Sequence, residues 1–529
     1  MSNVARFLPI FFFLIAALVC STTMTRMIDD ERTQIGIMSA LGYSKGAVLA
    51  KYVIYSGGAA IIGSVAGYFL GTFLFPLVIL KAYTMLYNIE GFIYIFSPAY
   101  FLVSLAISLV CSVGTTVVSC RGALKCPPAD LIRPKTPAAG KRIWLERITP
   151  IWSRLKFMHK VTLRNIFRFK KRMIMMLMGV AGCTALLLTG FGINDSVANL
   201  GNFQFDDILT YDISVTFSDE ITEDEISNVS DELSDVIEAQ AISMSYSTDV
   251  SANDVYKTAY YIVSDDDSFS DVISLHLDEE EVSLPTDGGV LVSEKLASML
   301  DVDVGDSITV YTTDGEMAEA TVSGLVENYV QHYIYMTGEA YEDIFGEEYE
   351  PETLMLRLTD DADHYSVSAT LLNMDGISAV TVVNDTRQMI DNMMQSLNYV
   401  VALILICAAA LAFIVMFNLG NINISERARE IATIKVIGFH KSETNDYVFR
   451  ENIVLTLMGI VIGLPLGVLL HAFVMSQIKV DMVSFKVVIS PISFVFTVLL
   501  VILFAIVTDL ILRKKISAID MAESLKSVE

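Results

Sequence analysis

The sequence predicts an α-helical integral membrane protein with seven spans and an extracytoplasmic α/β domain carrying a small β lobe. The chain of 529 residues is 53% hydrophobic and its mean hydropathy is +0.53, above the range of ordinary soluble domains. Seven apolar runs have about the length, ~20 residues, that a spanning helix needs. Between two of them lies an acidic block, residues 194–390, in which strand-like and helix-like patterns alternate.

The seven apolar runs differ in length. They lie at about 7–24, 53–80, 99–120, 173–193, 398–419, 452–476 and 491–512. The second run is long, so we expect it to tilt or kink. A large soluble protein with buried helices is the alternative, but uninterrupted runs of this length exceed normal core helices. We therefore assign all seven runs to the membrane.

Charge is distributed unevenly along the chain, whose formal net charge is −25. The block 194–390 holds most of the acidic residues, whereas residues 121–172 are strongly basic. The few basic residues of the acidic block are Lys257, Lys295, Arg357 and Arg387. Because Lys and Arg near span ends mark the cytoplasmic side, 121–172 is expected inside and 194–390 outside. The acidity argues against a nucleic-acid partner and indicates a solvated acidic face rather than a calcium site.

One short phrase occurs twice, each time between apolar runs. It reads ERTQIGIMSALGYSK from Glu31 to Lys45 and ERAREIATIKVIGFHK from Glu426 to Lys441. The shift that aligns the phrases also aligns two sets of glycines in the runs that follow. These are Gly63, Gly67 and Gly71 in the first copy and Gly459, Gly463 and Gly467 in the second. Small residues at this spacing let another helix approach closely, so the chain contains two three-span repeats with helix-packing glycines.

The repeat divides the chain into five segments. These are a first three-span unit at 1–133, a basic cytoplasmic linker at 134–172, a span at 173–193, an extracytoplasmic domain at 194–390 and a second three-span unit at 391–529. The span 173–193 and the external domain precede the second unit, and the first unit has no counterpart of either. We therefore expect the sequence to be a truncated or split form of a longer protein, whose upstream half would carry them.

The external block reads as two lobes. Residues 211–217 alternate as a strand does, and Thr222 with Glu225 opens a helical pattern as a capping box. Residues 288–336 read as a compact, mostly β lobe inserted between the two ends of an α/β lobe. A helix near 384–420 is expected to run from this domain into the membrane without a loop. Such a helix would act as a rigid lever.

No arrangement of catalytic or ligand-binding residues stands out in the sequence. The six histidines are scattered, and none of the six cysteines lies in the external block, which must therefore be held by its own core without disulfides. The motifs HExxH, GxSxG and GxxxxGK[ST] are absent from the sequence. We expect no catalytic, metal or cofactor site in this chain. A bacterial plasma membrane fits the cysteine-free external domain.

The repeated phrase has the pattern of a short helix that ends at a glycine. Ile35, Met38 and Leu41 fall on overlapping faces of a helix through 30–41, and Gly42 is placed to end it as a C′ glycine. The second copy has Ile431, Ile434, Ile437 and Gly438. A short helix with apolar side chains and charged ends suits docking into a groove on a partner. An amphipathic helix resting on lipid headgroups is the alternative.

These features resemble the FtsX-like (MacB/LolC-type) ABC transporter permeases. The resemblance rests on the two phrases, each followed by a glycine-spaced span, and covers about 7–133 and 398–525. The stretches DGGVLVSEKLASMLDVDVGDSITV and VSGLVENYV also resemble the external domain of that family. The resemblance implies one coupling helix in each unit, docking into a separate cytoplasmic ATP-binding subunit that is present in two copies. That subunit would bind ATP and Mg, and this chain would need no cofactor.

By position, the resemblance assigns a docking surface to each coupling helix. The residues are Gln34, Ile35, Met38, Leu41 and Gly42 in the first copy and Arg429, Glu430, Ile431, Ile434 and Gly438 in the second. The first copy departs from the charged pattern of the second, with Gln34 in place of Glu430 and Ser39 in place of Lys435. We therefore expect the two sites to bind with unequal strength.

The resemblance implies a permease subunit that couples ATP hydrolysis in its partner to work outside the membrane. That work would be the export or extraction of an amphiphile such as a peptide, lipid or lipoprotein. The alternative is an ATPase-driven regulator or sensor that activates a cell-wall hydrolase or detects antimicrobial peptides without moving cargo. In both cases the chain is expected to be a non-catalytic membrane subunit.

Overall fold

The computed structural model describes residues 2–84, 93–132, 153, 157–168, 170–218, 220–278, 280–312, 315–478 and 480–519. The chain forms two compact units. The membrane unit comprises residues 1–195, 398–479 and 487–529, and the external unit comprises 196–397 and 480–486. Much of the basic linker predicted at 134–172 lies outside the described residues.

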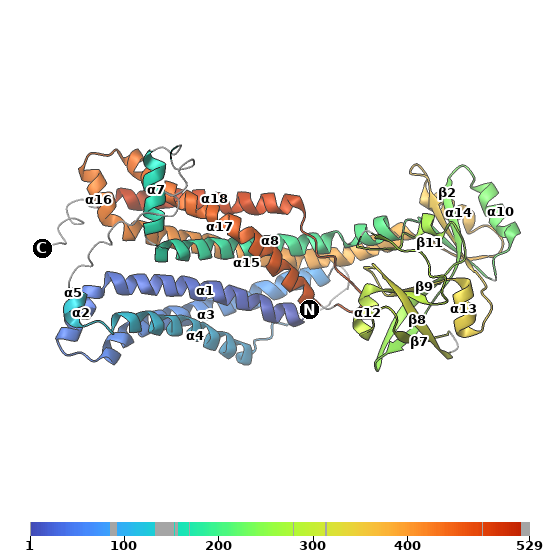
Figure 1. Ribbon diagram of the computed structural model, residues 1–529, viewed down its shortest axis with the longest axis horizontal. Coiled ribbons are helices and arrows are strands. Elements are labelled where there is room, and N and C mark those ends of the chain that lie inside the picture. The colour runs from blue at the N-terminus through green and yellow to red at the C-terminus, as the bar shows by residue number, and fades with distance from the viewer. Residues whose placement is uncertain are drawn as a thin grey trace. The chain divides into compact units, whose positions relative to one another are not determined.

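Helices make up the membrane unit (Figure 1). In the first repeat they are α1 (Ser2–Asp30), α2 (Arg32–Ala40), α3 (Lys45–Tyr83), α4 (Pro98–Ala123) and α5 (Pro128–Ile132). The others are α7 (Phe157–Arg168), α8 (Lys170–Ala198), α15 (Val383–Glu426), α16 (Ala428–Val436), α17 (Lys441–Gln477) and α18 (Pro491–Ser517). Among the described residues, seven helices are long and apolar enough to cross a membrane. Each overlaps one predicted run, so the seven predicted spans are confirmed.

Matching signals begin the last span of each repeat. Pro98 opens α4 and Pro491 opens α18, each directly after a serine. Proline suits the first position of a helix because its missing N–H would have no intrahelical partner there. The predicted helix near 384–420 is α15, which begins at Val383 directly after a strand that ends at Val382. The prediction of one uninterrupted helix is therefore confirmed.

The two glycine sets have different surroundings. A Cβ atom built on Gly459, Gly463 or Gly467 of α17 would lie 2.6, 2.6 and 2.9 Å from the Cβ atoms of Val180, Thr184 and Leu188 on α8, respectively. These glycines therefore let α17 and α8 approach at backbone distance. In α3, no atom of a neighbouring described residue lies within 4 Å of a Cβ atom built on Gly63 or Gly67. Together with Gly71, they line a groove of about 800 Å³.

Strands dominate the external unit. They are β1 (Ile213–Phe217), β2 (Ile237–Ala252), β3 (Val255–Val263), β4 (His276–Leu277), β5 (Glu280–Glu281), β6 (Val290–Ser293), β7 (Ser307–Tyr311), β8 (Met317–Val326), β9 (Tyr333–Met336), β10 (Thr353–Leu358) and β11 (Ile377–Val382). The helical segments are α9 (Leu200–Asn202), the π-helical turn η2 (Phe203–Ile208), α10 (Glu223–Glu232), α11 (Phe269–Val272), α12 (Glu294–Leu300), α13 (Gly338–Phe345) and α14 (His364–Leu371).

The 16-residue strand β2 takes part in both a four-stranded sheet and a barrel. Its first half pairs with β10 in an antiparallel sheet of order β11-β1-β10-β2. Its second half pairs with both β3 and β7. Because β3, β9, β6, β8 and β7 follow one another in the sheet order, the β2–β7 pairing closes a six-stranded barrel. The β lobe predicted at 288–336 holds four strands of this barrel, β6 to β9, whereas β2 and β3 lie outside the predicted bounds.

Each lobe has its own core. The barrel encloses apolar side chains that include Tyr261, Val292, Val310 and Ile334. In the α/β lobe, alternate residues of β1 and β10 pack against side chains of α10 and α14. This second core includes Ile213, Val215, Leu356, Val229 and Leu371. The predicted capping box of α10 is confirmed, since Thr222 and Glu225 exchange hydrogen bonds between side chain and backbone.

We predict that Gly463→Leu destabilises the membrane unit and Gly67→Leu does not. A side chain at Gly463 would meet Cβ of Thr184 at 2.6 Å and the carbonyl of Ala181 at 2.7 Å. Overpacking of this kind costs roughly 1–3 kcal/mol, which should lower the melting temperature of a unit of this size by about 1–5 °C. Gly67 is the matched control because it has open space at the corresponding position of the repeat. Equal melting temperatures for the two purified variants would contradict the packing role.

Candidate functional site

The short helices α2 and α16 lie at the same end of the membrane unit (Figure 1). Each follows the first span of its repeat. Each ends at a glycine with a left-handed backbone, Gly42 at φ +90° and Gly438 at φ +99°. The N–H of the next residue donates back to the helix, from Tyr43 to the Met38 carbonyl at 3.1 Å and from Phe439 to the Ile434 carbonyl at 3.3 Å. This is a Schellman ending, and the predicted C′ glycines are confirmed.

The side chains assigned to docking point in different directions. Ile35 and Ile431 are only 2% and 0% exposed and pack inside the membrane unit. Leu41 is 72% exposed. Of the other assigned residues, Gln34, Gly42, Arg429 and Gly438 are exposed and Met38, Glu430 and Ile434 are half-buried.

Sequence reasoning missed part of the outward face. Ile37, Val436 and Ile437 are 47%, 58% and 70% exposed and were not assigned to docking, although Ile437 matches Leu41 in the repeat. Ile37 lies four residues before Leu41, so helical spacing alone places these two side chains on one face. The outward apolar face of α2 therefore carries Ile37 and Leu41, and that of α16 carries Val436 and Ile437.

The first residue before α2 ties this helix to α3. Glu31, at the N-cap position, accepts a hydrogen bond from the Lys51 ammonium at 2.6 Å and another from the Tyr52 hydroxyl at 2.8 Å. The Lys51 ammonium holds the pKa of Glu31 below its usual range. The pair is partly exposed, with side-chain accessibilities of 41% for Lys51 and 26% for Glu31, so it contributes little stability.

The matching residue before α16 is Arg427, and here the ion pair is buried. Its guanidinium donates to Glu451 of α17 at 2.8 Å and to Glu430 at 2.9 Å, and it lies 4.7 Å from the ring centre of Tyr447. The side chains of Arg427 and Glu451 are 2% and 1% exposed. Removing one partner of such a pair costs roughly 3–5 kcal/mol because the other charge stays buried.

The link between α17 and α18 forms part of the external unit. In this segment, residues 480–486, Met482 accepts a hydrogen bond from the Gln331 N–H and Ser484 donates one to the Tyr329 carbonyl, each at 2.8 Å. Lys486 donates to Glu327 at 3.0 Å. Nothing in the sequence indicated this attachment, which depends on residues about 150 positions apart.

Charge strengthens this attachment at two places. Burial raises the pKa of Glu327, but hydrogen bonds from Tyr329 and Lys486 outweigh it and hold that pKa below its usual range. A second pair joins Lys257 to Asp481 at 2.7 Å, with Asp481 59% exposed. Because Glu327 is 8% exposed, the Lys486–Glu327 pair is the stronger of the two anchors of segment 480–486.

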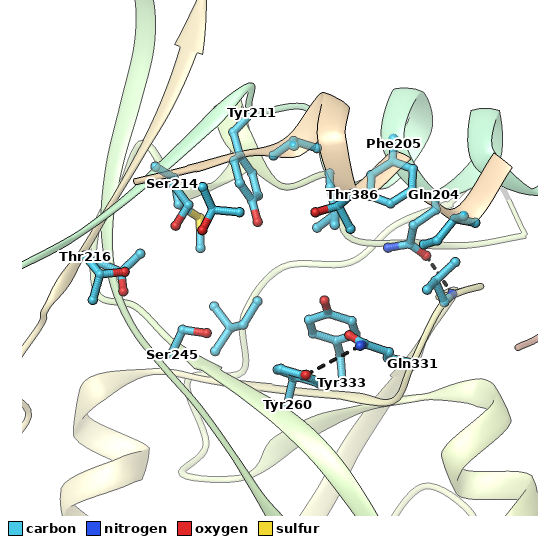
Figure 2. Close-up of a pocket in the computed structure, with 18 residues that line it drawn as sticks. Gln204, Phe205, Tyr211, Ser214, Thr216, Ser245, Tyr260, Gln331, Tyr333 and Thr386 are labelled. Carbon is cyan, nitrogen blue, oxygen red and sulfur yellow. Dashed lines mark hydrogen bonds between the residues drawn. The ribbon is translucent and has the colours of Figure 1, made fainter. Parts of the chain in front are cut away.

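A cavity of about 480 Å³ lies between the two lobes of the external unit, all within one compact unit. It covers the face of the four-stranded sheet that is turned away from the α10 and α14 core. Neighbouring strands place hydroxyls side by side there, since Ser214 pairs with Thr381 and Thr216 with Thr353. Figure 2 shows Tyr211 and Tyr333 on opposite sides of the cavity, with their hydroxyls directed into it.

The lining of the cavity is polar and uncharged. Among the 18 described residues that line it, none is Asp, Glu, Lys, Arg or His. Nine carry hydroxyls: Tyr211, Ser214, Thr216, Ser245, Tyr260, Tyr333, Thr353, Thr381 and Thr386. Burial raises the pKa of Tyr211 to about 12, so its hydroxyl is neutral at physiological pH. Over the described ranges, no group of three His, Cys, Asp or Glu side chains could hold a metal ion.

Two family models match the chain. The model described as FtsX-like permease C-terminal matches residues 6–128 and again 402–521. The model described as MacB-like periplasmic core domain matches residues 173–373. A comparison with curated proteins found no match.

Two solved structures are similar to parts of the chain. One is the extracellular domain of the noncanonic ABC-type transporter YknZ from Gram-positive bacteria, at 15% identity and a TM-score of 0.24, covering 32% of this chain and 98% of that one. The other is the periplasmic region of MacB from Actinobacillus actinomycetemcomitans, at 13% identity and a TM-score of 0.22, covering 35% of this chain and 95% of that one.

We predict that Glu451→Gln loosens α16, because Arg427 would lose its buried anion. The N–H of Ile431, which donates to the Arg427 carbonyl at 2.9 Å, reports on the opening of this helix. Its hydrogen exchange should become faster by at least about tenfold, corresponding to ~1.4 kcal/mol or more. Lys51→Met is the matched control in the first repeat, where the exposed pair is worth roughly 0–1 kcal/mol.

The double variant Arg427→Met/Glu451→Met separates loss of a pair from exposure of a lone charge. It removes both charges, so exchange of the Ile431 N–H should return toward the wild-type rate. Exchange as fast as in Glu451→Gln alone would show that the charge itself, rather than its pairing, holds α16.

We also predict that Lys486→Met releases segment 480–486 more than Lys257→Met does. The first change leaves Glu327, which is 8% exposed, without its cation, whereas Asp481 can be hydrated when Lys257 is lost. Hydrogen exchange at the Gln331 and Ser484 amides should quicken by roughly tenfold in Lys486→Met and by less than about fivefold in Lys257→Met. The reverse order would make the exposed pair the main anchor.

Proposed function

Because this chain belongs to the FtsX/MacB-type permeases, whose two family models together span both repeats and the external unit, we propose that it couples a cytoplasmic ATPase to movement outside the membrane. It is a multi-pass ABC-transporter-type membrane permease with an extracytoplasmic domain over the predicted block 194–390. The proposal concerns the ATPase that would drive this permease and the substrate on which the permease would act. Two copies of the ATPase subunit would bind to the chain, one at α2 and one at α16.

The observation that carries the proposal is the duplication of an outward apolar side chain beside a fixed helix end. Leu41 and Ile437 occupy matching positions, are the most exposed apolar residues of the two phrases, and precede glycines of left-handed backbone. The 37 residues of α17 separate α16 from segment 480–486 of the external unit. That length, about 55 Å at 1.5 Å per residue, exceeds the thickness of a bilayer. This length supports a cytoplasmic position for α16, where an ATPase would be.

Movement could be transmitted from α16 to the external unit through α15. Arg427, which lies between α15 and α16, is fixed to α17 through Glu451. The helix α15 is continuous for 44 residues and starts directly after β11. A displacement of α16 would thus be passed along one unbroken helix to the external sheet. This arrangement supports mechanical work outside the membrane. We propose that the substrate is an amphiphile such as a peptide, lipid or lipoprotein, as in the expectation from the family resemblance.

The test is the stimulation of a cassette ATPase by the full chain in lipid nanodiscs. A double variant Leu41→Asp/Ile437→Asp should abolish stimulation, because central apolar side chains at an interface are worth 2 kcal/mol or more each, about thirtyfold in affinity. The control is Met317→Asp in the external unit, whose native side chain is 71% exposed. Undiminished stimulation by the double variant would contradict the proposed docking surface.

The glycines at the helix ends offer an independent variant. Gly438→Val forces a β-branched residue into the left-handed backbone at φ +99°, which costs on the order of 1–3 kcal/mol and shifts Ile437. Stimulation should fall while insertion into the membrane is unchanged. Ile431→Asp is unsuitable as a docking test because that side chain is 0% exposed and would disturb the interior.

A further inference from the structure

We propose that the cavity of the external unit binds an uncharged, hydroxyl-rich ligand, namely a short neutral glycan. This site goes beyond the coupling function, and its existence does not depend on any ATPase. It is carried by the chemistry of the cavity wall, by the lack of protein partners for that wall's hydroxyls, and by the size of the space.

Strand register gives the cavity a continuous hydroxyl surface. In β1, Ile213, Val215 and Phe217 face the helix-covered core, so Ser214 and Thr216 face the cavity. The pairing of Ser214 with Thr381 and of Thr216 with Thr353 brings four hydroxyls from three adjacent strands onto one face. A ligand lying on this face would meet hydrogen-bonding groups at the spacing of neighbouring strands, about 5 Å.

Most of these hydroxyls have no protein partner. Among the described residues, no hydrogen bond involves the hydroxyls of Tyr211, Tyr333, Ser214 or Thr353. Thr353 is 5% exposed. Polar groups enclosed in a protein are nearly always hydrogen-bonded, to protein or to water. None of these hydroxyl oxygens is among the fully buried atoms that lack a partner. They are therefore open to the cavity, where water or a ligand can complete their hydrogen bonds.

Other polar groups of the wall are already occupied and hold it in shape. The Gln204 carbonyl oxygen accepts from the N–H groups of Tyr329 and Val330 at 2.9 and 3.0 Å. Gln331 donates to the Tyr260 hydroxyl at 3.4 Å, as the dashed line in Figure 2 shows. Tyr260 and Tyr333 are stacked with their ring centres 5.6 Å apart. The two glutamines and the stacked rings thus fix the side of the cavity opposite the sheet.

Charge selects against most other ligands. A cationic group in the cavity would find no carboxylate and an anionic group would find no lysine or arginine among the lining residues, and burying an unpaired charge is costly. An acyl chain would remove water from the hydroxyls without replacing its hydrogen bonds. A glycan supplies donors and acceptors without charge, and its C–H faces suit the aromatic rings and Phe205. The volume of about 480 Å³ lies in the range of small-ligand sites.

The test measures sugar binding by the full chain in nanodiscs that contain no glycosidic detergent. Isothermal titration with two neutral disaccharides, diacetylchitobiose and maltose, should detect saturable binding of at least one. The single variant Tyr333→Phe and the double variant Ser214→Val/Thr353→Val each remove hydroxyl groups from the cavity wall but leave a side chain of similar volume in place. Each should weaken binding by about tenfold, as loss of a hydrogen bond in an enclosed site does. Tyr256→Phe is the control, because Tyr256 lies on β3 but is 65% exposed and does not line the cavity.

Two outcomes would overturn the proposal. One is the absence of saturable binding of either disaccharide to the wild-type chain. The other is binding that both cavity variants leave unchanged. Nanodiscs doped with a neutral glycolipid separate the sources of the glycan. Competition with the free sugar would identify a lipid headgroup as the source, whereas absence of competition would identify a free glycan. Both of these results support the site, and neither depends on ATPase stimulation.

Discussion

The burial of one arginine constrains the end of the membrane unit that carries the short helices. A guanidinium keeps its proton in a protein, so Arg427, at 2% exposure, has to be held by anions. Glu451 supplies one from α17 and Glu430 supplies one from α16 itself. The chain enters Arg427 from α15 and leaves it as α16. Three helices are therefore joined at one charge, next to Ile431, which is 0% exposed.

The first repeat has an ion pair at the same place, but the residue before its short helix is an acid instead of a base, and the pair is more exposed. Glu31 occupies the position of Arg427, and its cation Lys51 occupies that of Tyr447. Both copies tie the residue before the short helix to the following span, but only the second does so out of contact with water. The glycine sets differ in the same direction, packed against α8 in the second repeat and open in the first. The repeat thus duplicates backbone geometry without duplicating the strength of its contacts.

Sequence reasoning succeeded where the determining physics is local. Span length needs only a run of apolar residues, and the endings at Gly42 and Gly438 need only a residue that tolerates positive φ. The capping box of Thr222 and Glu225 lies within four residues. Contacts between distant residues were not predictable in this way. Closure of the barrel depends on β2 pairing with β7, and the anchoring of segment 480–486 depends on Lys486 finding Glu327.

Strand alternation carries more information than which residues enter the core. Ser214 and Thr216 alternate with the core residues of β1. They would usually be expected to face solvent, because the second face of an antiparallel sheet is commonly solvated. In this domain the long strand β2 belongs to both the four-stranded sheet and the barrel, so the barrel lies beside the second face of that sheet. Tyr260 and Tyr333 of the barrel help to enclose this face. Water would satisfy the hydroxyls of an open face, and an acidic domain would place carboxylates there as it does elsewhere on its surface. The absence of charge among the lining residues therefore distinguishes this face from a solvated surface and gives it the composition of a binding wall.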